Sequence, residues 1–436
     1  MRSPSRAATA AKLATAALTL AALLTPWTAG LAPDLPLPSL RGARFPFLGA
    51  ALALALAARL ALWLAYRPAR PTAAERAALP TLTVVIPAYN EGPGVRRTID
   101  SVLASAYPPE RLRVIAVNDG SKDDTGRHLD DAARAHPDRV TALHLPRNAG
   151  KRHALYAGFS RATSELVATV DSDSTVPPES LAHLVTPLAR DPKVGGVAGR
   201  VLVANRNENL LTRLLGVRYI LGFDFIRGYQ SVLRTVWCCP GALQAYRLAL
   251  IAPHLEAWRD QRFLGAACTN GDDHALTNLV LSLDHDTVYQ QSAEVHTLVP
   301  ARYVKLSKMY LRWGRSATRE GLRALAFTSR RLRRLGPWRG PLMAADGLLR
   351  MLVILTKLLG LPLALYALFT DPLWLVHGAL AATAGAALYA LVFLRSERST
   401  ESLFAITYTW FALLALFWIQ PLATLTVRKN GWMTRG

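Results

Sequence analysis

Short apolar runs alternate with helical patterns between residues 81 and 175, and this alternation constrains the fold more than any other feature. The apolar runs are Thr81 to Ile86, Leu112 to Val117, Val140 to Leu145 and Leu166 to Val170. Segments with helical spacing, Arg96 to Ala106 and Asp124 to Ala135, lie between them. Strands that alternate with helices predict an α/β, Rossmann-like domain with a parallel sheet and helices on both faces.

Polar turns follow three of these apolar runs. They are Pro87–Glu91, Asn118–Ser121 and Asp171–Asp173. Open α/β sheets bind ligands at the carboxyl ends of their strands, so we expect the three turns to lie at one site.

The third turn carries Asp171 and Asp173, with one residue between them, directly after Val170. Residues two apart on a strand point to the same side, so both carboxylates can face one cation. Mg²⁺ and Mn²⁺ accept such oxygen ligands, and a metal held here can neutralise a diphosphate. An acidic turn that caps the next helix is the alternative, and the pair alone leaves both interpretations open.

The distribution of charge indicates a membrane partner rather than a nucleic acid. Hydrophobic residues make up 51% of the chain, and the net charge is +21. Between Arg302 and Arg339 there are twelve Lys and Arg residues against one acid, Glu320. Because this basic run abuts an apolar segment, we expect it to meet membrane lipids of an anionic cytoplasmic leaflet, with no nucleic acid as partner.

Apolar segments flank the α/β region on both sides. Lys12 to Leu31 and Phe45 to Tyr66 each have the length of a membrane span, so residues 1–67 are predicted to form two transmembrane helices. The basic stretch within residues 296–342 has helical periodicity and suits amphipathic helices in the membrane interface. Residues 343–436 are predicted to form the C-terminal transmembrane helices.

Three C-terminal segments are candidate spans: Leu348 to Phe369, Leu373 to Leu394 and Leu403 to Val427. Three further spans would put the C-terminus outside, whereas Arg428 and Lys429 favour the inside. A break at Pro421 would make the last segment re-entrant and remove this conflict, so the number of spans stays open.

Six short motifs occur in order between residues 81 and 320: Pro87-Ala88-Tyr89-Asn90-Glu91, Asn118-Asp119-Gly120-Ser121, Asn148-Ala149-Gly150-Lys151-Arg152, Asp171-Ser172-Asp173, Gly271-Asp272-Asp273 and Arg312-Trp313. In this order and spacing they resemble the membrane-embedded synthases of glycosyltransferase family 2. Within the family the chain is most similar to hyaluronan synthases and chitin-oligosaccharide synthases, through Asn148–Leu155, Gln230–Arg247 and Gly271–Asn278.

The resemblance implies a fold and a cellular place. The fold is a cytoplasmic catalytic domain of the GT-A type over residues 81–295, followed by interface helices that carry Arg312-Trp313. Transmembrane helices would flank both on the N-terminal and C-terminal sides. We therefore expect a multi-pass protein of the plasma (inner) membrane, with the catalytic domain on the cytoplasmic side where nucleotide sugars are found.

The resemblance also implies a UDP-sugar donor, UDP-GlcNAc or UDP-GlcA, and Mn²⁺ or Mg²⁺ as cofactor. Tyr89 would stack on the uracil, and Glu91 and Asp119 would hydrogen-bond the base or ribose. Ordinary turn chemistry is the alternative for these residues, because Asp-Gly pairs are common in loops.

The diphosphate of the donor is expected to meet Lys151, Arg152 and Arg312, because arginine suits bidentate phosphate contacts and lysine a point contact. Asp171 and Asp173 match the family's metal motif, with the metal acting as a Lewis acid for the leaving UDP. A solvated basic turn is the alternative for Lys151 and Arg152.

Asp273 is the candidate general base, and Asp272 is expected to support it. Inverting transfer needs a carboxylate that takes the proton of the acceptor hydroxyl as this hydroxyl attacks the anomeric carbon. A helix N-cap is the alternative, since Gly271 and these acids open an apolar-periodic run.

Acceptor binding is expected from Trp313, which would stack on a sugar ring, and from the turn that contains Cys239 and Gly241. Asp224, Arg227 and Gln230 have the spacing of one helical face and are expected to border the same region. The chain departs from the family at Met309, where a glutamine is usual. Methionine cannot make the hydrogen bonds of that glutamine. The identity of the acceptor and the processivity of the enzyme are therefore in question.

Three functions remain open. The favoured one is an inverting synthase that polymerises sugar from a UDP-sugar and moves the growing glycan chain across the membrane. A second is a non-processive enzyme that adds one sugar to a lipid carrier. A third is a catalytically dead scaffold, which predicts loss of the carboxylates, yet all of them are present. The sugar itself rests on pocket shape, which motifs do not encode.

Overall fold

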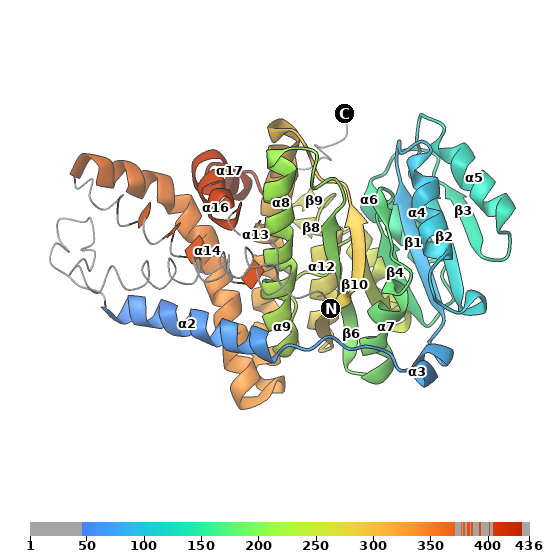
Figure 1. The fold of residues 1–436 in the computed structure, drawn as a ribbon, viewed down its shortest axis with the longest axis horizontal. Coiled ribbons are helices and arrows are strands. Elements are labelled where there is room, and N and C mark those ends of the chain that lie inside the picture. Colours follow the sequence, from blue (N-terminus) through green and yellow to red (C-terminus); the bar gives the residue numbers. More distant parts are fainter. Residues whose placement is uncertain are drawn as a thin grey trace, which may run out of the picture.

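The computed structural model describes residues 46–370 and 404–429, together with residue 401 and single positions between 376 and 393. The predicted span Lys12 to Leu31 lies outside the described residues, and Leu373 to Leu394 lies largely outside them. Figure 1 shows the α/β domain on one side of the molecule and the long apolar helices on the other.

A mixed eight-stranded sheet in the order β3-β2-β1-β4-β7-β6-β10-β5 forms the centre of the domain. The strands are β1 Leu82–Ala88, β2 Leu112–Asn118, β3 Val140–His144, β4 Leu166–Val170, β5 Ser174–Thr175, β6 Val194–Val203, β7 Leu243–Arg247 and β10 Asp286–Thr297. A small hairpin of β8 Arg262–Phe263 and β9 Ala266–Ala267 stands apart from this sheet.

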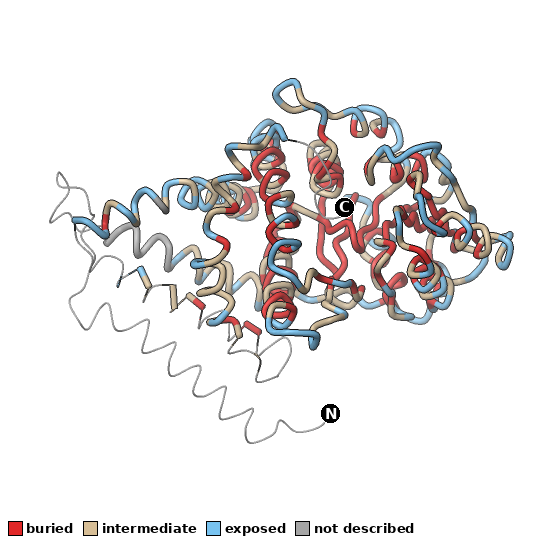
Figure 2. Tube along the Cα trace, turned by 90° about the horizontal axis from the view of Figure 1, so that it is seen from above, coloured by how far each residue is buried: buried red, intermediate tan, exposed pale blue. Residues whose placement is uncertain are grey.

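The first half of the sheet follows the predicted parallel pattern. β1 pairs in parallel with β2 and β4, and β2 pairs in parallel with β3. Every residue of β1 and β4 is buried, as continuous apolar strands are when helices cover both faces. The tube in Figure 2 shows buried residues gathered in the interior of the α/β domain.

The second half corrects the prediction of a wholly parallel sheet. β7 lies antiparallel between β4 and β6, and β5 pairs antiparallel with β10. β10 was not predicted from the sequence. It carries polar residues and is interrupted by a bulge between Gln290 and Glu294, so neither an apolar run nor strict alternation marks it.

Helices pack on the sheet along its whole width. They are α4 Gly94–Leu103, α5 Thr125–Ala135, α6 Lys151–Phe159, α7 Ser180–Arg190, α10 Leu248–Ile251, α11 Leu255–Arg259 and α12 Asp272–Ser282. The short elements are α3 Ala73–Ala77, η2 Pro109–Arg111 and η4 Ala252–His254. α4 and α6 pack against β1 and β2, and α7 packs against β6 and β10.

Residues 210–232 form one helical stretch with a π-helical segment at its centre, as the helical spacing of Asp224, Arg227 and Gln230 predicts in part. α8 Leu210–Ile220 runs into the π-helix η3 Leu221–Arg227, which continues as α9 Gly228–Val232. π-Helical turns are rare and are frequent at functional sites, because they re-aim the side chains of one turn.

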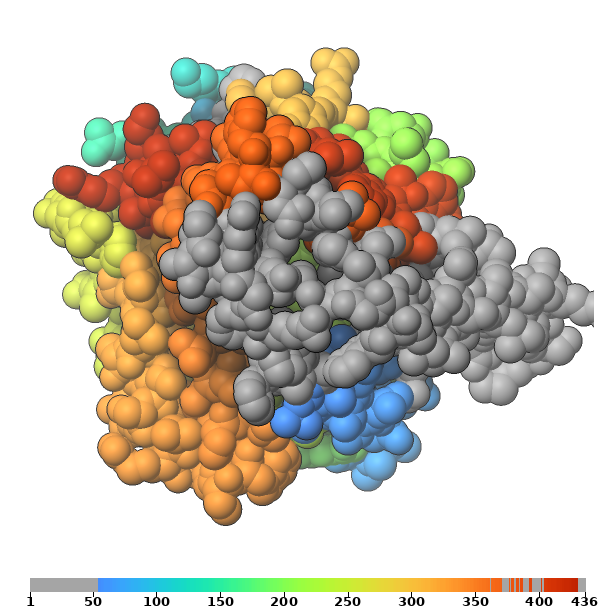
Figure 3. All heavy atoms as spheres, turned by 90° about the vertical axis from the view of Figure 1, so that its left-hand side faces the viewer, coloured from blue at the N-terminus to red at the C-terminus, as the bar shows by residue number. Residues whose placement is uncertain are grey.

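The described residues also include the helices α2 Pro46–Ala65, α13 Tyr303–Arg334, α14 Gly336–Thr370 and α16 Phe404–Ala415, the last followed by α17 Ile419–Leu425. α13 is the predicted basic helix, and it packs against α12, α14 and α17. Figure 3 shows α2, α14 and the α16–α17 pair together on the face opposite the sheet.

Within the described ranges, no single helix is both long and apolar enough to cross a bilayer. Two bent pairs meet the length and composition together: Gly336–Gly360 with Pro362–Thr370, bent by 53°, and α16 with α17, bent by 50°. The bend lies between Ala415 and Ile419 and not at Pro421, where the sequence suggested a break. Pro421 lies in the first turn of α17, where its missing N–H costs no hydrogen bond.

Candidate active site

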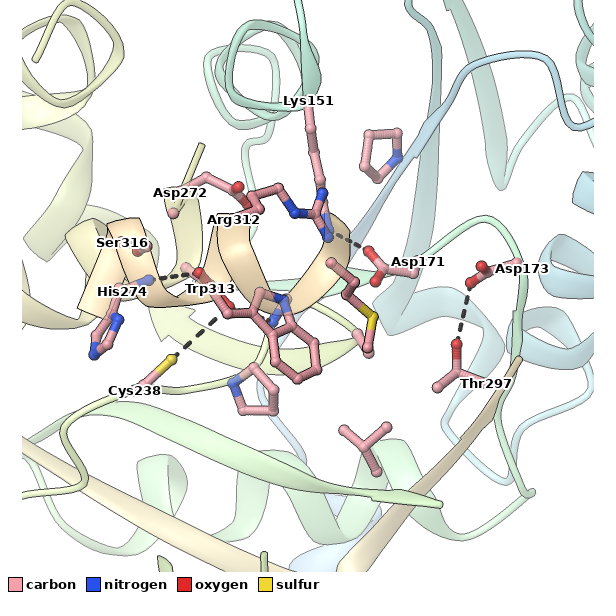
Figure 4. Close-up of a pocket in the computed structure, with 18 of the residues that line it drawn as sticks. Lys151, Asp171, Asp173, Cys238, Asp272, His274, Thr297, Arg312, Trp313 and Ser316 are labelled. Carbon is pink, nitrogen blue, oxygen red and sulfur yellow. Dashed lines mark hydrogen bonds and ion pairs between the residues drawn. The ribbon is translucent and has the colours of Figure 1, made fainter. Parts of the chain in front are cut away.

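A cavity of about 740 Å³ opens at the carboxyl ends of β1 and β4 and is bounded by α8, η3, α12 and α13. The polar turns after β1, β2 and β4 all contribute to its wall, as their positions in the sequence predict. Figure 4 shows the acidic residues gathered around this cavity, with Trp313 between them.

Asp171 and Asp173 both line the cavity, and both are half-buried. Asp173 Oδ1 accepts a hydrogen bond from Thr297 Oγ1 at 3.2 Å, which ties the turn to β10. The described residues hold no cluster of three or more His, Cys, Asp or Glu side chains suited to a metal. Two carboxylates fit Mg²⁺ or Mn²⁺ that takes its remaining ligands from diphosphate oxygens and water.

Lys151 is the first residue of α6, and its ammonium donates a hydrogen bond to Asp171 Oδ1. Burial opposes the charge of Lys151, but Asp171, Asp272 and Asp273 outweigh it and raise the pKa of the lysine. The ammonium therefore stays charged at the meeting point of three carboxylates.

Asp119 fixes the loop that delivers Lys151. Its two carboxylate oxygens accept the backbone N–H groups of Ala149 at 2.8 Å and Gly150 at 2.9 Å. Burial raises the pKa of Asp119 although these hydrogen bonds lower it. Asp119 also lines the cavity, so the structure places it beside the donor region while adding a positioning role that the sequence did not reveal.

Gly241 permits the close approach of Lys151 to the turn after β4. A Cβ atom at this position would lie 2.9 Å from Lys151 Nζ and 3.8 Å from Asp273 Cβ. The Gly241 N–H also points to Asp273 Oδ2 at 3.4 Å. Gly241 itself lines the cavity.

Asp272 and Asp273 begin α12, and both line the cavity. Asp273 Oδ1 accepts the backbone N–H of His274 at 2.8 Å, and Cys238 Sγ lies 3.8 Å from Asp273 Oδ2. Asp272 is 5% exposed, and burial raises its pKa against the opposing charge of Lys151. Asp273 is the more accessible of the two side chains.

His274 and Cys238 lie beside Asp273. Cys238 belongs to the turn expected to border the acceptor, whereas His274 was not predicted at the site. Loss of hydration, with the charges of Arg350, Arg227 and Arg319, lowers the pKa of His274 to about 3. Burial and Asp273 raise the pKa of the Cys238 thiol. These shifts favour the neutral forms of both groups.

Arg312 and Trp313 reach the cavity from α13. The Trp313 ring is 43% exposed, and its centroid lies 5.4 Å from that of Tyr310 and 6.3 Å from that of Tyr219. An exposed indole backed by two rings is a rigid platform for the apolar face of a sugar.

Met309 lines the cavity one turn before Trp313. It is 8% exposed and belongs to an apolar cluster with Val299, Leu306 and Ile419. Met309, the position that departs from the family, therefore lines the cavity and also packs between α13 and α17.

Arg152 does not meet the cavity, which corrects its assignment to the diphosphate. Its guanidinium is 1% exposed, donates to the carbonyls of Trp258 and Asn270, and lies over the Trp258 ring. Asn270 lies just before α12, which begins at Asp272. Through its hydrogen bond to the Asn270 carbonyl, Arg152 therefore helps to position the start of α12 at the cavity.

Gln230 and Cys239 also point away from the cavity, so their assignment to the acceptor is wrong. Gln230 Nε2 donates to Asp346 Oδ2 at 3.1 Å, and Cys239 donates its backbone N–H to Thr277 Oγ1 at 2.9 Å. Both side chains are buried. The neighbour Cys238 faces the cavity instead.

Of the remaining predicted residues, some line the cavity and others do not. Tyr89 and Arg227 line the cavity, whereas Glu91 does not and accepts a hydrogen bond from Ser172 Oγ at 2.9 Å. Asp224 is 1% exposed and is held by both Arg200 and Tyr289.

Several lining residues were missed because their helices are irregular or distant in sequence. Tyr219, Phe223 and Arg218 come from the junction of α8 and η3, and Arg350 comes from α14. A π-helical segment shifts the helical face by one position, so regular spacing could not have identified them.

The sequence matches known glycosyltransferases over most of its described length. Residues 83–253 match the family described as glycosyl transferase family 2. An N-acetylglucosaminyltransferase of Rhizobium meliloti (strain 1021) is 32% identical over 298 residues, which cover 68% of each chain. A hyaluronan synthase of Streptococcus pyogenes is 35% identical over 246 residues, 55% of this chain and 58% of the synthase. The match thus spans little more than half of the hyaluronan synthase.

A solved structure shares the fold. The mannosyltransferase of Pyrobaculum calidifontis, in complex with GDP-Man and Mn²⁺, aligns with a TM-score of 0.56 at 23% identity, over 92% of this chain and 99% of that one. The alignment agrees with a GT-A-like α/β fold built on a mixed sheet. With the extent of the Rhizobium match, these findings place the chain in glycosyltransferase family 2, and it is a glycosyltransferase.

Proposed function

We propose that the chain is an inverting synthase that transfers a sugar from a UDP-sugar donor to a growing glycan. One observation carries the proposal. Lys151, Asp171, Asp173, Asp273 and Trp313 come from four separate segments of the sequence and meet around one cavity. These are the parts needed to hold a diphosphate, to take a proton from an acceptor and to seat a sugar ring.

The donor diphosphate would lie against Lys151, Arg312 and the turn of Asp171 and Asp173. When bound by these two carboxylates, Mn²⁺ or Mg²⁺ would supply Lewis-acid stabilisation to the leaving group. Lys151 adds a fixed positive charge at the same place, because Asp119 holds its loop. Tyr89 would face the base of the nucleotide.

The acceptor sugar would lie on Trp313 with a hydroxyl directed at Asp273. As this hydroxyl oxygen forms its bond to the anomeric carbon, the bond from that carbon to the diphosphate oxygen breaks, and UDP leaves. The hydroxyl proton passes to the Asp273 carboxylate. Attack from the face opposite the diphosphate inverts the anomeric centre.

The relatives support UDP-GlcNAc as a donor, since they are named an N-acetylglucosaminyltransferase and a hyaluronan synthase. Repeated transfer and passage of the product along α14, α16 and α17 are part of the same proposal. The bent apolar pairs of these helices would be the segments that enter the membrane, with the catalytic domain on the cytoplasmic side.

Transfer of one sugar to a lipid carrier is the second candidate, and Met309 is the observation that favours it. A thioether cannot make the hydrogen bonds of the family's glutamine, and this weakens the case for processive elongation.

The test is UDP release by the purified full-length protein with Mn²⁺ or Mg²⁺ over a panel of UDP-sugars, with products sized on a gel. Asp173→Asn and Asp273→Asn should each abolish release. Asp131→Asn on the exposed surface of α5 is the matched control and should retain it. A long ladder supports the synthase, a single addition supports the lipid-carrier function, and activity that survives both site substitutions contradicts the proposed site.

A further inference from the structure

A histidine at the outer edge of the sheet is hydrogen-bonded to the turn that carries Asp119. His144 ends the edge strand β3, and Asn118, its partner in register, ends β2. Asn118 Nδ2 lies 3.2 Å from His144 Nδ1, and His144 Nε2 lies 2.8 Å from Asp130 Oδ1 of α5. Figure 1 shows β3 and α5 together at this edge of the domain. The histidine therefore lies outside the cavity but next to one of the turns that form it.

The hydrogen bonds of Asn118 decide which His144 nitrogen carries a proton. Asn118 Oδ1 accepts the Ser121 backbone N–H at 2.9 Å, so the NH2 group of the same amide faces His144. An amide nitrogen only donates, and therefore Nδ1 of His144 must accept. The ring proton then lies on Nε2, which donates it to Asp130. This arrangement is that of a neutral imidazole.

Asn118 in turn fixes the two turns that meet the nucleotide in the proposed function. Ser121, which donates its N–H to Asn118, accepts the Asn90 backbone N–H at its Oγ, over 3.0 Å. Tyr89 precedes Asn90 and Asp119 follows Asn118 in the sequence, and both line the cavity. The relative position of these two lining residues therefore depends on the hydrogen bonds of Ser121 and Asn118.

The turn after β2 has little room to adjust. A Cβ atom on Gly120 would lie 2.4 Å from the Arg147 carbonyl carbon, and one on Gly126 of α5 would lie 3.0 Å from Asn118 Nδ2. Asn118 is 7% exposed, so water does not readily replace a hydrogen bond that it loses. A change at the Asn118 amide is therefore passed to the turn instead of being absorbed by solvent.

Protonation of His144 is incompatible with this set of hydrogen bonds. Both ring nitrogens of an imidazolium are donors, so an N–H at Nδ1 would face the NH2 group of Asn118. Rotating the amide restores a hydrogen bond to the ring, but it turns the NH2 group toward the Ser121 N–H, which then loses its acceptor. The turn is therefore intact when the ring is neutral and weakened when the ring is charged.

The charged groups around His144 do not offset this change. Asp130 accepts the Nε2–H in both protonation states, so it orients the ring without deciding the state of Nδ1. Among the described residues, Asp130 is the one charged side chain that bonds to the ring, and β2 presents to it only the uncharged Asn118. The other charged residues of α5 pair with one another or with Asp124: Arg127, His128, Asp131 and Arg134.

We propose that His144 is a positioning residue for donor binding, and that it holds the nucleotide-binding turns only as a neutral imidazole. Histidine is the side chain that changes its charge between about pH 5 and pH 8, so donor affinity should fall as the pH falls through this range. The inference rests on the proposed function and adds to it a residue outside the cavity. Because Asp273 and the acceptor wall take no part, the effect is expected in the KM for the donor and not in kcat.

The test is the KM for the donor from about pH 8 to about pH 5.5, with UDP-GlcNAc or whichever UDP-sugar of the panel releases UDP. A UDP-sugar is used instead of UDP, because the terminal phosphate of UDP itself takes up a proton in this range. The wild type is compared with His144→Asn, in which an amide oxygen replaces Nδ1 as the acceptor and does not titrate. Toward acid, the KM of the wild type should rise about three- to tenfold more than that of the variant, on the scale of one hydrogen bond.

Two further variants separate the ring from the turn. Asn118→Asp should bind the donor in acid as well as at neutral pH, because a carboxylate accepts from the Ser121 N–H and from a protonated His144 at once. His128→Asn is the matched control and should keep the wild-type pH profile. His128 Nε2 also meets a carboxylate, Asp124 at 3.1 Å, but its ring makes no hydrogen bond to residues 118–121 in the described part of the chain.

Each other outcome overturns the inference. The same pH dependence of the donor KM in the wild type and in His144→Asn would show that the ring does not act on the donor, and so would a difference confined to kcat. Acid sensitivity that persists in Asn118→Asp would show that the Asn118 amide does not respond to His144, and this comparison holds even if His144→Asn does not fold. Failure of the proposed function is recognised separately, because UDP would then be released from no donor at any pH.

Discussion

Lys151 at the start of α6 donates a hydrogen bond to Asp171 at the end of β4, so a cation lies against one of the two proposed metal ligands. Burial alone would favour a neutral lysine, but the surrounding carboxylates raise its pKa and keep it charged. We expect the ammonium and a divalent metal to compete for this oxygen, and a donor diphosphate would bind both cations.

This competition predicts opposite effects of one substitution. Lys151→Ala should bind Mn²⁺ more tightly than the wild type without nucleotide, because a competing charge is removed. It should bind UDP about tenfold or more weakly, because a charge-assisted contact to the diphosphate is lost. Electron paramagnetic resonance of free Mn²⁺ measures the first effect, and equilibrium binding of UDP measures the second.

Lys122→Ala, at an exposed position, is the matched control and should change neither affinity. If Lys151→Ala bound Mn²⁺ no more tightly than the wild type, the lysine would not be a competitor at this site.

The sequence predicted the parallel half of the sheet and the position of the site, because both depend on local patterns. β1 and β4 are buried along their whole length and β2 nearly so, so each appears as an apolar run, and a polar turn follows at the ligand edge. β7, which is antiparallel to both of its neighbours, and β10, which pairs mainly in parallel with β6, were not predicted, because neither carries a plain apolar run or strict alternation.

The sequence also could not predict the direction in which each side chain points. Lys151 and Arg152 are adjacent and carry the same charge, yet one enters the cavity and the other is buried against Trp258. Cys238 and Cys239 divide in the same way. Neighbouring residues on a helix or turn point in different directions, and only the tertiary packing decides which one faces the ligand.

An ion pair between Arg59 and Asp346 joins α2 to α14 with an N–O distance of 2.5 Å. The Asp346 side chain is 3% exposed and accepts three further hydrogen bonds, so its removal leaves several buried donors without a partner. Asp346→Ala should lower the free energy of unfolding by about 3–5 kcal/mol, the range for one partner of a buried pair.

A double-mutant cycle with Arg59→Met tests whether the two residues act together. The double variant should be destabilised less than the sum of the two single variants, by about 0.5–3 kcal/mol. Chemical unfolding of the purified protein measures all three variants, and strictly additive losses would mean that the ion pair does not couple the two helices.

Asp191 predicts an acid-dependent loss of stability. Burial opposes its ionisation, but hydrogen bonds from Arg234 and from the Lys193 backbone N–H outweigh burial and lower its pKa. A depressed acid pKa contributes stability above the unfolded value near 3.9, and this contribution disappears as the pH falls through the folded pKa. Asp191→Asn should therefore be less stable than the wild type at neutral pH, and the difference should shrink below about pH 4.

Thermal unfolding of the two proteins across this pH range is the measurement. A difference that stayed constant down to about pH 3 would mean that the charge of Asp191 contributes nothing to stability.

Met309 is the residue at which stability and product length should separate. Met309→Gln puts an amide into the apolar cluster of Val299, Leu306 and Ile419, so it should lower the free energy of unfolding by about 1–3 kcal/mol. The same amide also faces the cavity, one turn from Trp313, where it can hydrogen-bond an acceptor sugar. We therefore expect Met309→Gln to give longer products than the wild type in spite of its lower stability.

Met309→Leu is the matched control, because it keeps the apolar volume and supplies no hydrogen bond. It should retain both the stability and the product length of the wild type, as measured by chemical unfolding and by gel sizing of the glycan. If the glutamine variant gave the same product length as the leucine variant, the departure from the family at position 309 would affect only the packing of α13 on α17. Processivity would then depend on other residues of the cavity wall.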